Sequence, residues 1–402
     1  MKSDKTTPNV PTLRFAEFTD EWEKYELSHF VTRITRRNKN NESSLPLTIS
    51  AQYGLVDQIS FFNKTVASVD LSGYYLLYNG DFAYNKSYSN DYAWGAVKRL
   101  DKYEKGCLSS LYFVFRPNDN IDSDYLTHYF ESSKWHKGIS NIAGEGARNH
   151  GLLNMAVDDY FATKHYLPSL PEQRKIARVF NAITRRIEIQ NKIIEDLKVL
   201  KKELCAKLFG SPLCGRIIAI EQVADIYGGY AFNSKAYVNK GKYKIVTIGN
   251  VTGDKYISGN YNTIDRLPNN IQKPQVLSKG DILVSLTGNV GRISIVDGDE
   301  YLLNQRVAKL GIEDDLTKEY IYQYLSNSSF EKDMINAGQG AAQKNIKNQD
   351  ILSYCIRFPT DQTALENIDK LLSLYDMRIT SEKAILSNLI LQKSYYLRAM
   401  FI

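Results

Sequence analysis

The sequence predicts an α+β protein: two modules of mixed α/β character, in a pseudo-two-fold arrangement, separated by two long antiparallel coiled-coil helices. A heptad-like apolar pattern without Gly or Pro covers residues 174–209, and a matching pattern returns 192 residues later. Upstream of each pattern, short strand-and-turn segments share matching motifs, which indicates a tandem duplication. The length of 402 residues also exceeds what one typical core accommodates.

The predicted boundaries follow this duplication along the chain: a first module over 1–168, a helix over 169–210, a second module over 211–358 and a helix over 359–402. Ser169 and Glu172 have the spacing of a capping box, and Pro171 fits the first helical turn. Gly210 ends the first helix, and the second is expected to begin near Thr360.

Each predicted helix has two polar positions in its apolar seam. These are Gln190 and Lys201 in the first helix, and Glu382 and Lys393 in the second. In an antiparallel pair related by a two-fold axis, Lys201 facing Glu382 also places Gln190 against Lys393. We expect these polar layers to fix the register of the pair.

Both modules contain Gly-flanked loops that mix basic, amide, hydroxyl and aromatic side chains. Such groups can hold phosphates or base edges, although a single loop of this kind is more often an ordinary polar turn. Two sets at matching points of a two-fold frame favour a pair of DNA readers at a fixed separation. The candidate DNA-binding residues are Lys86, Ser87, Tyr88, Trp94, Lys98, Arg99, Arg148, Asn149 and His150 in the first module, and Ser285, Thr287, Asn289, Arg292, Asn304, Gln305, Arg306, Gln343 and Lys344 in the second.

The predicted helices carry more apolar surface than a two-helix seam can bury. This surplus either packs on the chain's own modules or receives helices of partner subunits. The candidate partner-binding residues are Val179, Ile189, Ile193, Leu200, Leu371, Ile385, Ile390 and Leu391.

Several classes of protein are disfavoured by what the sequence lacks. It contains no Gly-x4-Gly-Lys-Ser/Thr phosphate loop and no adjacent prolines, so the Pro-Pro motif of amino-group DNA methyltransferases is missing. Five dispersed histidines and four single cysteines show no metal-ligand spacing. No apolar run approaches the ~18 residues of a membrane span, and no apolar stretch follows Met1. We therefore expect a cytoplasmic protein with no catalytic residues and no metal site.

At five places the sequence resembles the specificity subunits of type I restriction-modification systems. These places are Val10–Phe18 with Trp22, Leu167–Ile176, the Lys-rich run that ends at Lys207–Phe209, Lys279–Leu283 and Gly338–Ile346. The resemblance extends over essentially the whole chain. The second helix departs from the pattern because it lacks the Pro-Glu-Gln entry found at Pro171.

The resemblance implies that the modules are target recognition domains, each reading one half of an asymmetric bipartite DNA sequence. The helices would set the unread gap and bind two methylation subunits, which restriction subunits then join. The family also implies that S-adenosylmethionine, ATP and Mg belong to those partners, with no cofactor in this chain. The alternative from another class is a non-catalytic coiled-coil scaffold that binds proteins, which would lack the steep salt dependence of DNA binding.

Overall fold

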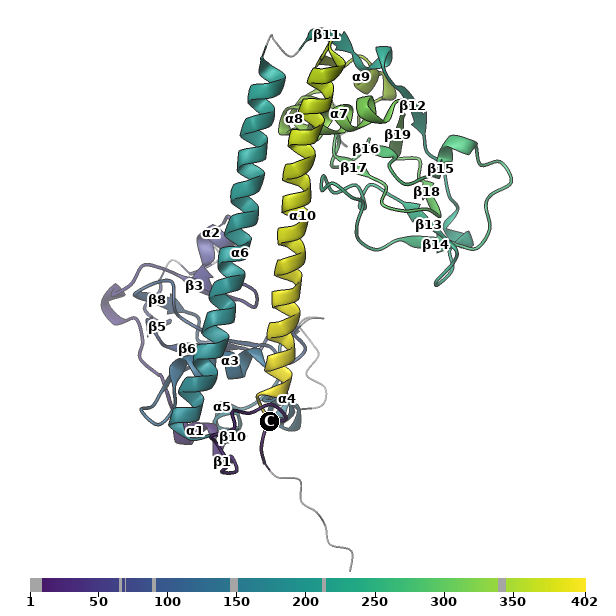
Figure 1. The fold of residues 1–402 in the computed structure, drawn as a ribbon. Coiled ribbons are helices and arrows are strands. Elements are labelled where there is room, and N and C mark those ends of the chain that lie inside the picture. Colours follow the sequence, from purple (N-terminus) through teal and green to yellow (C-terminus); the bar gives the residue numbers. More distant parts are fainter. Residues whose placement is uncertain are drawn as a thin grey trace, which may run out of the picture. The chain divides into compact units, whose positions relative to one another are not determined.

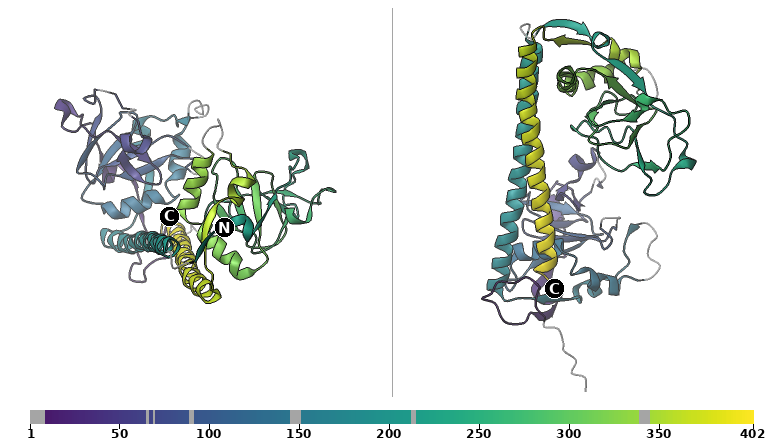
Figure 2. Two further views of the ribbon diagram at one scale, coloured as in Figure 1. Left: turned by 90° about the horizontal axis from the view of Figure 1, so that it is seen from above. Right: turned by 45° about the vertical axis from the view of Figure 1, so that its right-hand side comes forward.

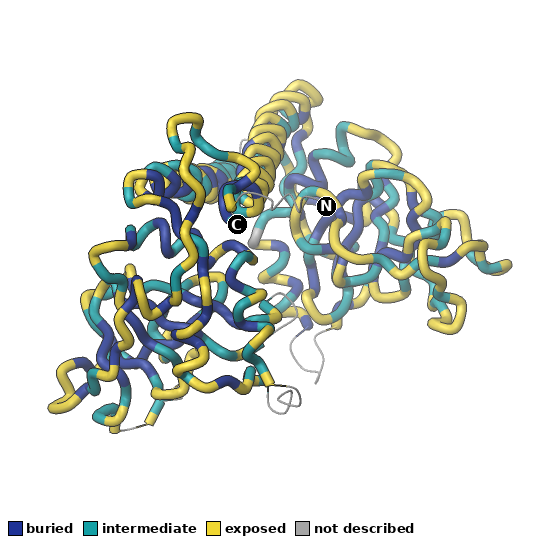
Figure 3. The backbone as a smooth tube through the Cα atoms, turned by 90° about the horizontal axis from the view of Figure 1, so that it is seen from below, coloured by how far each residue is buried: buried dark blue, intermediate teal, exposed yellow. Residues whose placement is uncertain are grey.

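The computed structural model describes residues 9–64, 67–68, 70–88, 92–144, 151–211, 215–338 and 345–402. The chain forms two compact units, Met1–Gln190 with Ile385–Ile402, and Asn191–Ala384. Each unit has its own hydrophobic core, in which buried strands and helix faces are surrounded by exposed loops (Figure 3). The two long helices contribute residues to both units (Figure 1).

The first unit consists of short strands and helices followed by the first half of α6. In chain order these are β1 Glu23–Glu26, α1 Leu27–Phe30, β2 Val31–Arg33, η1 Lys39–Asn41, β3 Leu47–Ser50, β4 Gly54–Asp57, α2 Gln58–Phe62, β5 Tyr75–Tyr78, β6 Phe82–Asn85, β7 Ala96–Arg99, β8 Lys105–Leu108, β9 Phe113–Pro117, α3 Ser123–Glu131, α4 His136–Ile142, α5 Val157–Phe161, β10 Lys164–Leu167 and α6 Leu170–Gly210. Its central sheet has the antiparallel order β2-β9-β6-β7.

The second unit repeats the central sheet of the first, but its smaller strands pair differently. Its elements are β11 Arg216–Ala219, η4 Ile220–Gln222, β12 Asp225–Gly228, η5 Ser234–Ala236, β13 Tyr243–Val246, β14 Asn262–Ile264, η6 Lys273–Gln275, β15 Val276–Leu277, β16 Ile282–Ser285, β17 Ile293–Ile295, β18 Tyr301–Leu303, β19 Val307–Gly311, α7 Asp315–Leu325, α8 Ser328–Ala337, α9 Asn348–Leu352, β20 Cys355–Phe358 and α10 Gln362–Ala399. Its central sheet, β12-β19-β16-β17, has the same antiparallel order as the sheet of the first unit. Its smaller strands form one four-stranded sheet, β14-β13-β18-β15, where the first unit has two strand pairs, β3-β4 and β5-β8.

One turn is built in the same way in both units. Gly80 and Gly280 adopt φ values of 85° and 91°, which favour glycine. The next residue is Asp81 or Asp281, whose carboxylate accepts a hydrogen bond from the backbone N–H three residues earlier at 2.8 Å. Basic side chains from the neighbouring strand, Arg116 at 2.6 Å and Lys309 at 2.7 Å, neutralise these carboxylates. The predicted duplication therefore extends to individual hydrogen bonds.

Within each unit, α6 and α10 pack side by side in opposite directions (Figure 2). In the first unit Phe180, near the start of α6, stacks on Phe401, which follows the end of α10, with ring centroids 5.5 Å apart. In the second unit Lys201, late in α6, binds Asp376 in the first half of α10 at 2.5 Å. The predicted α+β class and the long antiparallel helices are confirmed.

The beginning of α6 differs in detail from a capping box. The Glu172 carboxylate, which is 1% exposed, forms a two-bond ion pair with Arg14 at 2.8 Å for each bond. Gln173 accepts a hydrogen bond from the Asp122 N–H at 2.8 Å and so ties α6 to the start of α3. These long-range contacts replace the local cap, because a buried carboxylate gains more from a guanidinium than from a backbone N–H.

Helix α10 begins at Gln362, two residues after Thr360, near which the sequence placed its start, and the Asp361 carboxylate accepts a hydrogen bond from the Thr363 N–H at 3.1 Å. One further expectation about the helices is corrected. The predicted partner of Lys201 is wrong, because Lys201 pairs with Asp376 and not with Glu382. Lys393 forms an ion pair with Glu131 of α3 at 2.9 Å, so modules as well as helices supply partners for the seam.

Candidate nucleic-acid interface

In the second unit, a cluster of four loops lies at one end of the central sheet. The hairpin loop between β16 and β17 contacts the loop after β18, because the Leu286 N–H donates to the Arg306 carbonyl at 3.0 Å. On its other side the Leu286 carbonyl accepts from the Ile346 N–H at 3.0 Å. The loop after β12 joins through Tyr230, whose carbonyl accepts from the Gln305 N–H at 3.0 Å. Backbone hydrogen bonds thus hold these loops together and leave side chains free for contacts.

The hairpin loop is held by Ser285, whose side chain is fully buried. Its hydroxyl donates to the Asn289 carbonyl and accepts from the Arg292 N–H at 3.0 Å. At Gly291, φ is 76° and an added Cβ would lie 2.8 Å from the Cβ of Met334, so a larger residue would disturb α8. Ser285 therefore shapes the loop and does not present its own hydroxyl to a ligand.

The first unit has the corresponding cluster. Ser87 bridges to Leu152 as Thr287 bridges to Asn345, with Ser87 and Thr287 two residues past the end of β6 and β16 respectively. The Tyr88 N–H donates to the Gly151 carbonyl at 3.1 Å. The hairpin loops of the two units therefore lie at equivalent ends of equivalent sheets.

The exposed members of these clusters are the best candidates for contacting a ligand. Gln305, Arg306 and Asn289 are exposed in the second unit, where Asn304 and Thr287 are half-buried. Arg292 is half-buried and binds Glu331 at 3.3 Å, so it could reach a phosphate only by leaving this carboxylate or sharing it. These polar and basic groups can donate hydrogen bonds to phosphates and to base edges.

In the first unit, Ser87 is exposed and Lys86 and Tyr88 are half-buried. The Lys86 ammonium lies 4.8 Å from the ring centroid of Phe113. Trp94 is half-buried against the core, and its carbonyl accepts from the Tyr84 hydroxyl at 2.9 Å, so much of its indole surface serves packing. The two clusters therefore expose different chemistry at equivalent places.

The structure places two candidates away from the loop cluster. The Arg99 guanidinium binds Asp124 at 2.7 Å and Asp101 at 2.6 Å. Burial lowers the pKa of Lys98, on which the charges of Glu131 in α3 and Lys393 in α10 also act. Both side chains thus take part in intramolecular interactions, because α3 packs against β7. The remaining candidates Arg148, Asn149, His150, Gln343 and Lys344 lie outside the described residues.

Two members of the clusters were not among the candidates. Gly229 would place an added Cβ 2.0 Å from the Asn304 carbonyl oxygen, so this position requires glycine for the loops to approach. Asn345 is exposed and bridges to Thr287. The Gly228–Gly229 pair at the end of a strand was the sequence signal for the first, and the second lies in the segment Gly338–Ile346 that carries part of the family resemblance.

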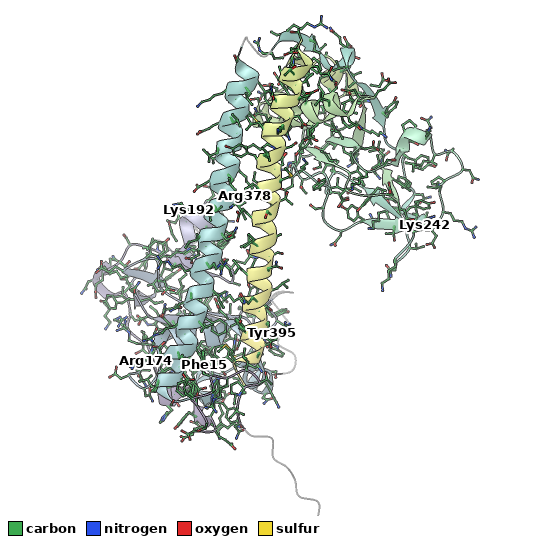
Figure 4. All side chains as sticks on the ribbon, in the orientation of Figure 1. Phe15, Arg174, Lys192, Lys242, Arg378 and Tyr395 are labelled. Atoms are coloured by element: carbon green, nitrogen blue, oxygen red, sulfur yellow. The ribbon has the colours of Figure 1, made fainter. Side chains whose placement is uncertain are left out.

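Of the eight apolar residues predicted to bind partners, seven are exposed and Val179 is half-buried. Their exposed fractions run from 37% at Ile193 to 66% at Leu391. Tyr395, also 54% exposed, lies toward the C-terminal end of α10 (Figure 4). The chain's own modules therefore leave most of this surface uncovered within the described residues.

In the described part of the chain, no helix combines the length and apolar character needed to cross a membrane.

Residues 216–390 match the family model of the type I restriction modification DNA specificity domain. The chain is 26% identical over 303 residues to the type I restriction enzyme MjaVIII specificity subunit of Methanocaldococcus jannaschii, covering 67% of this chain and 69% of that protein. It is 23% identical to the putative MjaX specificity subunit of the same organism, covering 87% of this chain and 86% of that one.

The fold is shared with solved structures of this class. The type I restriction-modification S subunit from M. genitalium matches with a TM-score of 0.55 at 16% identity, over 98% of this chain and 99% of that one. A chain solved in work on complex assembly and conformational transition of the type I R-M system matches with a TM-score of 0.53 at 18% identity, over 94% and 96%. The repeated sheets, the two long helices and these likenesses agree: the chain is similar over most of its length to specificity subunits of type I restriction-modification systems, and residues 216–390 match their DNA specificity domain.

Proposed function

We propose that this specificity subunit recognises a bipartite, asymmetric DNA sequence, with one half read by each module. The observation that carries the proposal is the pair of loop clusters at the same edge of equivalent sheets, in which the exposed side chains differ. Two loop clusters of unlike chemistry favour two unlike half-sites, because base identity is read by the pattern of donors and acceptors.

The chain acts in this proposal as a non-catalytic scaffold. Two methylation subunits dock on the exposed apolar residues of α6 and α10, and restriction subunits join the assembly. S-adenosylmethionine, ATP and Mg are then bound by those partners, and the complex works in the cytoplasm. The sequence supports this division because it lacks the Pro-Pro and phosphate-loop motifs of such enzymes.

The test uses the complex of the full chain with its methylation subunits. Methylated adenines are mapped by single-molecule sequencing in cells that express either the wild type or the double variant Gln305→Ala/Arg306→Ala. The variant is expected to relax one half of the recognised sequence and leave the other unchanged. If Arg306 reads a base, its loss costs about 1–3 kcal/mol. Lys370→Ala, which removes the same charge from an exposed site on α10, is the matched control.

Three outcomes discriminate between the candidate functions. A uniform loss over all sequences would assign Arg306 to a phosphate contact. Methylation patterns that never depend on this subunit would refute DNA recognition. Binding of partners without any salt-dependent DNA binding by the complex would instead favour the protein-binding scaffold.

A further inference from the structure

Two lysines occupy equivalent positions in the two long helices. Lys201 in α6 and Lys393 in α10 are 192 residues apart. The same separation relates Asp122 and Asp314, whose side chains cap α3 and α7 by accepting backbone hydrogen bonds. The repeat is therefore in constant register from the module helix to the end of the long helix.

In the second unit, Lys201 binds a carboxylate supplied by the long helix. Its ammonium lies 2.5 Å from Asp376 Oδ1, with side chains 14% and 9% exposed. Asp376 Oδ2 accepts a hydrogen bond from Gln323 Nε2 of α7 at 2.7 Å. Lys255 extends the cluster, 3.6 Å from Asp376 and 3.4 Å from Glu319. The residue of α7 that contacts this ion pair is thus Gln323, which is fully buried.

In the first unit, Lys393 binds a carboxylate supplied by the module instead. Its ammonium lies 2.9 Å from Glu131 Oε2 of α3, with side chains 17% and 27% exposed. His128 also contacts Glu131, at 3.2 Å, and the positive charge of Lys98 is nearby. The residue equivalent to Glu131 is Gln323.

The long-helix position shows the opposite exchange. The residue equivalent to Asp376 is Thr184, whose buried hydroxyl has no hydrogen-bond partner among the described residues. The first unit therefore combines Lys393 with Glu131 on the module helix and Thr184 on the long helix. The second unit combines Lys201 with Gln323 on the module helix and Asp376 on the long helix. Each combination contains one of the two equivalent lysines and one carboxylate, but the carboxylate has moved between the module helix and the long helix.

We infer that Lys201 and Lys393 are positioning residues, each of which anchors the module of the other repeat to the helix pair through one carboxylate. A half-buried lysine without a carboxylate would leave an uncompensated charge. In the second unit Glu319 has its own partner in Lys255, so Asp376 is the carboxylate that compensates Lys201. Either carboxylate position satisfies the lysine, so the two arrangements are interchangeable. The role in DNA recognition rests on the proposed function: the anchor holds each module in place along the helices and so helps to set the gap between half-sites.

The test transplants the arrangement of the first unit into the second. Asp376→Thr removes the carboxylate, Gln323→Glu adds one at the other position, and the double variant rebuilds the first unit's combination. Each single variant is expected to lower the urea midpoint of the full chain, while the double variant recovers at least half of the summed loss. Glu366→Thr, at an exposed carboxylate of α10, is the matched control and should leave the midpoint unchanged. A double variant with the additive loss would overturn the interchangeability of the two positions.

A second measurement tests positioning rather than stability. The assembled complex is offered duplexes whose gap is one base pair shorter or longer than in the wild-type target. The single variants are expected to discriminate less between these gaps, and the double variant to regain the wild-type preference. Rescue of the midpoint with unchanged gap preference in the single variants would overturn the positioning role. If the wild-type complex binds no duplex, the proposed function fails, while the urea cycle still decides whether the anchor exists.

Discussion

The carboxylate of Glu131 makes the stability of the first unit depend on pH in the acidic range. Burial alone would raise the pKa of Glu131, but the hydrogen bond from His128 and the charge of Lys393 lower it from 4.5 to about 2. A folded-state pKa below the unfolded value stabilises the fold at pH values above the unfolded pKa. That stabilisation is lost as the pH falls from about 4.5 toward 2. The shift corresponds to about 3 kcal/mol of unfolding free energy.

The perturbation is Glu131→Gln, which places in α3 the side chain that α7 carries at Gln323. We expect the variant to be less stable by about 3 kcal/mol at pH 7, with the difference shrinking to near zero at pH 2. Urea unfolding of wild type and variant, followed by circular dichroism between pH 2 and pH 7, measures this. Glu366→Gln, at an exposed carboxylate, is the control. A difference in unfolding free energy between wild type and Glu131→Gln that stays constant from pH 2 to pH 7 would refute the reasoning.

Further predictions concern a loop, a core histidine and the helix surface. Ser285→Ala leaves the Arg292 N–H without its buried acceptor, and should cost about 1–3 kcal/mol in urea unfolding; no loss would contradict the role in shaping the loop. Burial lowers the pKa of His165 from 6.5 to about 4, so its neutral form stabilises the fold above pH 6.5 and this contribution declines toward pH 4; a His165→Gln variant with the wild-type slope in that range would argue against it. Leu391→Asp should leave the urea midpoint unchanged but abolish co-purification with the methylation subunits. The control Lys332→Asp, at an exposed residue of α8, should change neither the midpoint nor co-purification.

The repeat and the helices were predictable because both leave periodic signals in one sequence. A heptad pattern returning after 192 residues fixes two helices and their equivalence, and helix α6 begins within a residue of its predicted start. The ion-pair partners of the polar seam residues were not predictable in the same way. The error at Lys201 arose because seam positions alone do not reveal Asp376, which contacts α7 of the module as well.

The candidate interface was predicted at the level of loops but not of side chains. Ser87 and Thr287 do lie in equivalent loops, because glycines and polar residues mark such turns. Lys98 and Arg99 are basic residues beside one of these loops, and nothing local distinguished them from exposed ones. The ion pair of Arg99 with Asp124 and the effect of the Glu131 charge on Lys98 depend on the packing of α3 against the sheet, which is a long-range property of the fold.

The hairpin loops of the two units differ in length, from Lys86 to Gly95 in one and from Leu286 to Arg292 in the other. Both nevertheless start from β-sheets of the same strand order, and Ser87 and Thr287 pair with the following segment in the same way. The tip of each loop can therefore change without altering the register of the strands beneath it. Exchange of a few tip residues would therefore change the side chains that the loop exposes, while the folding of the module stays untouched.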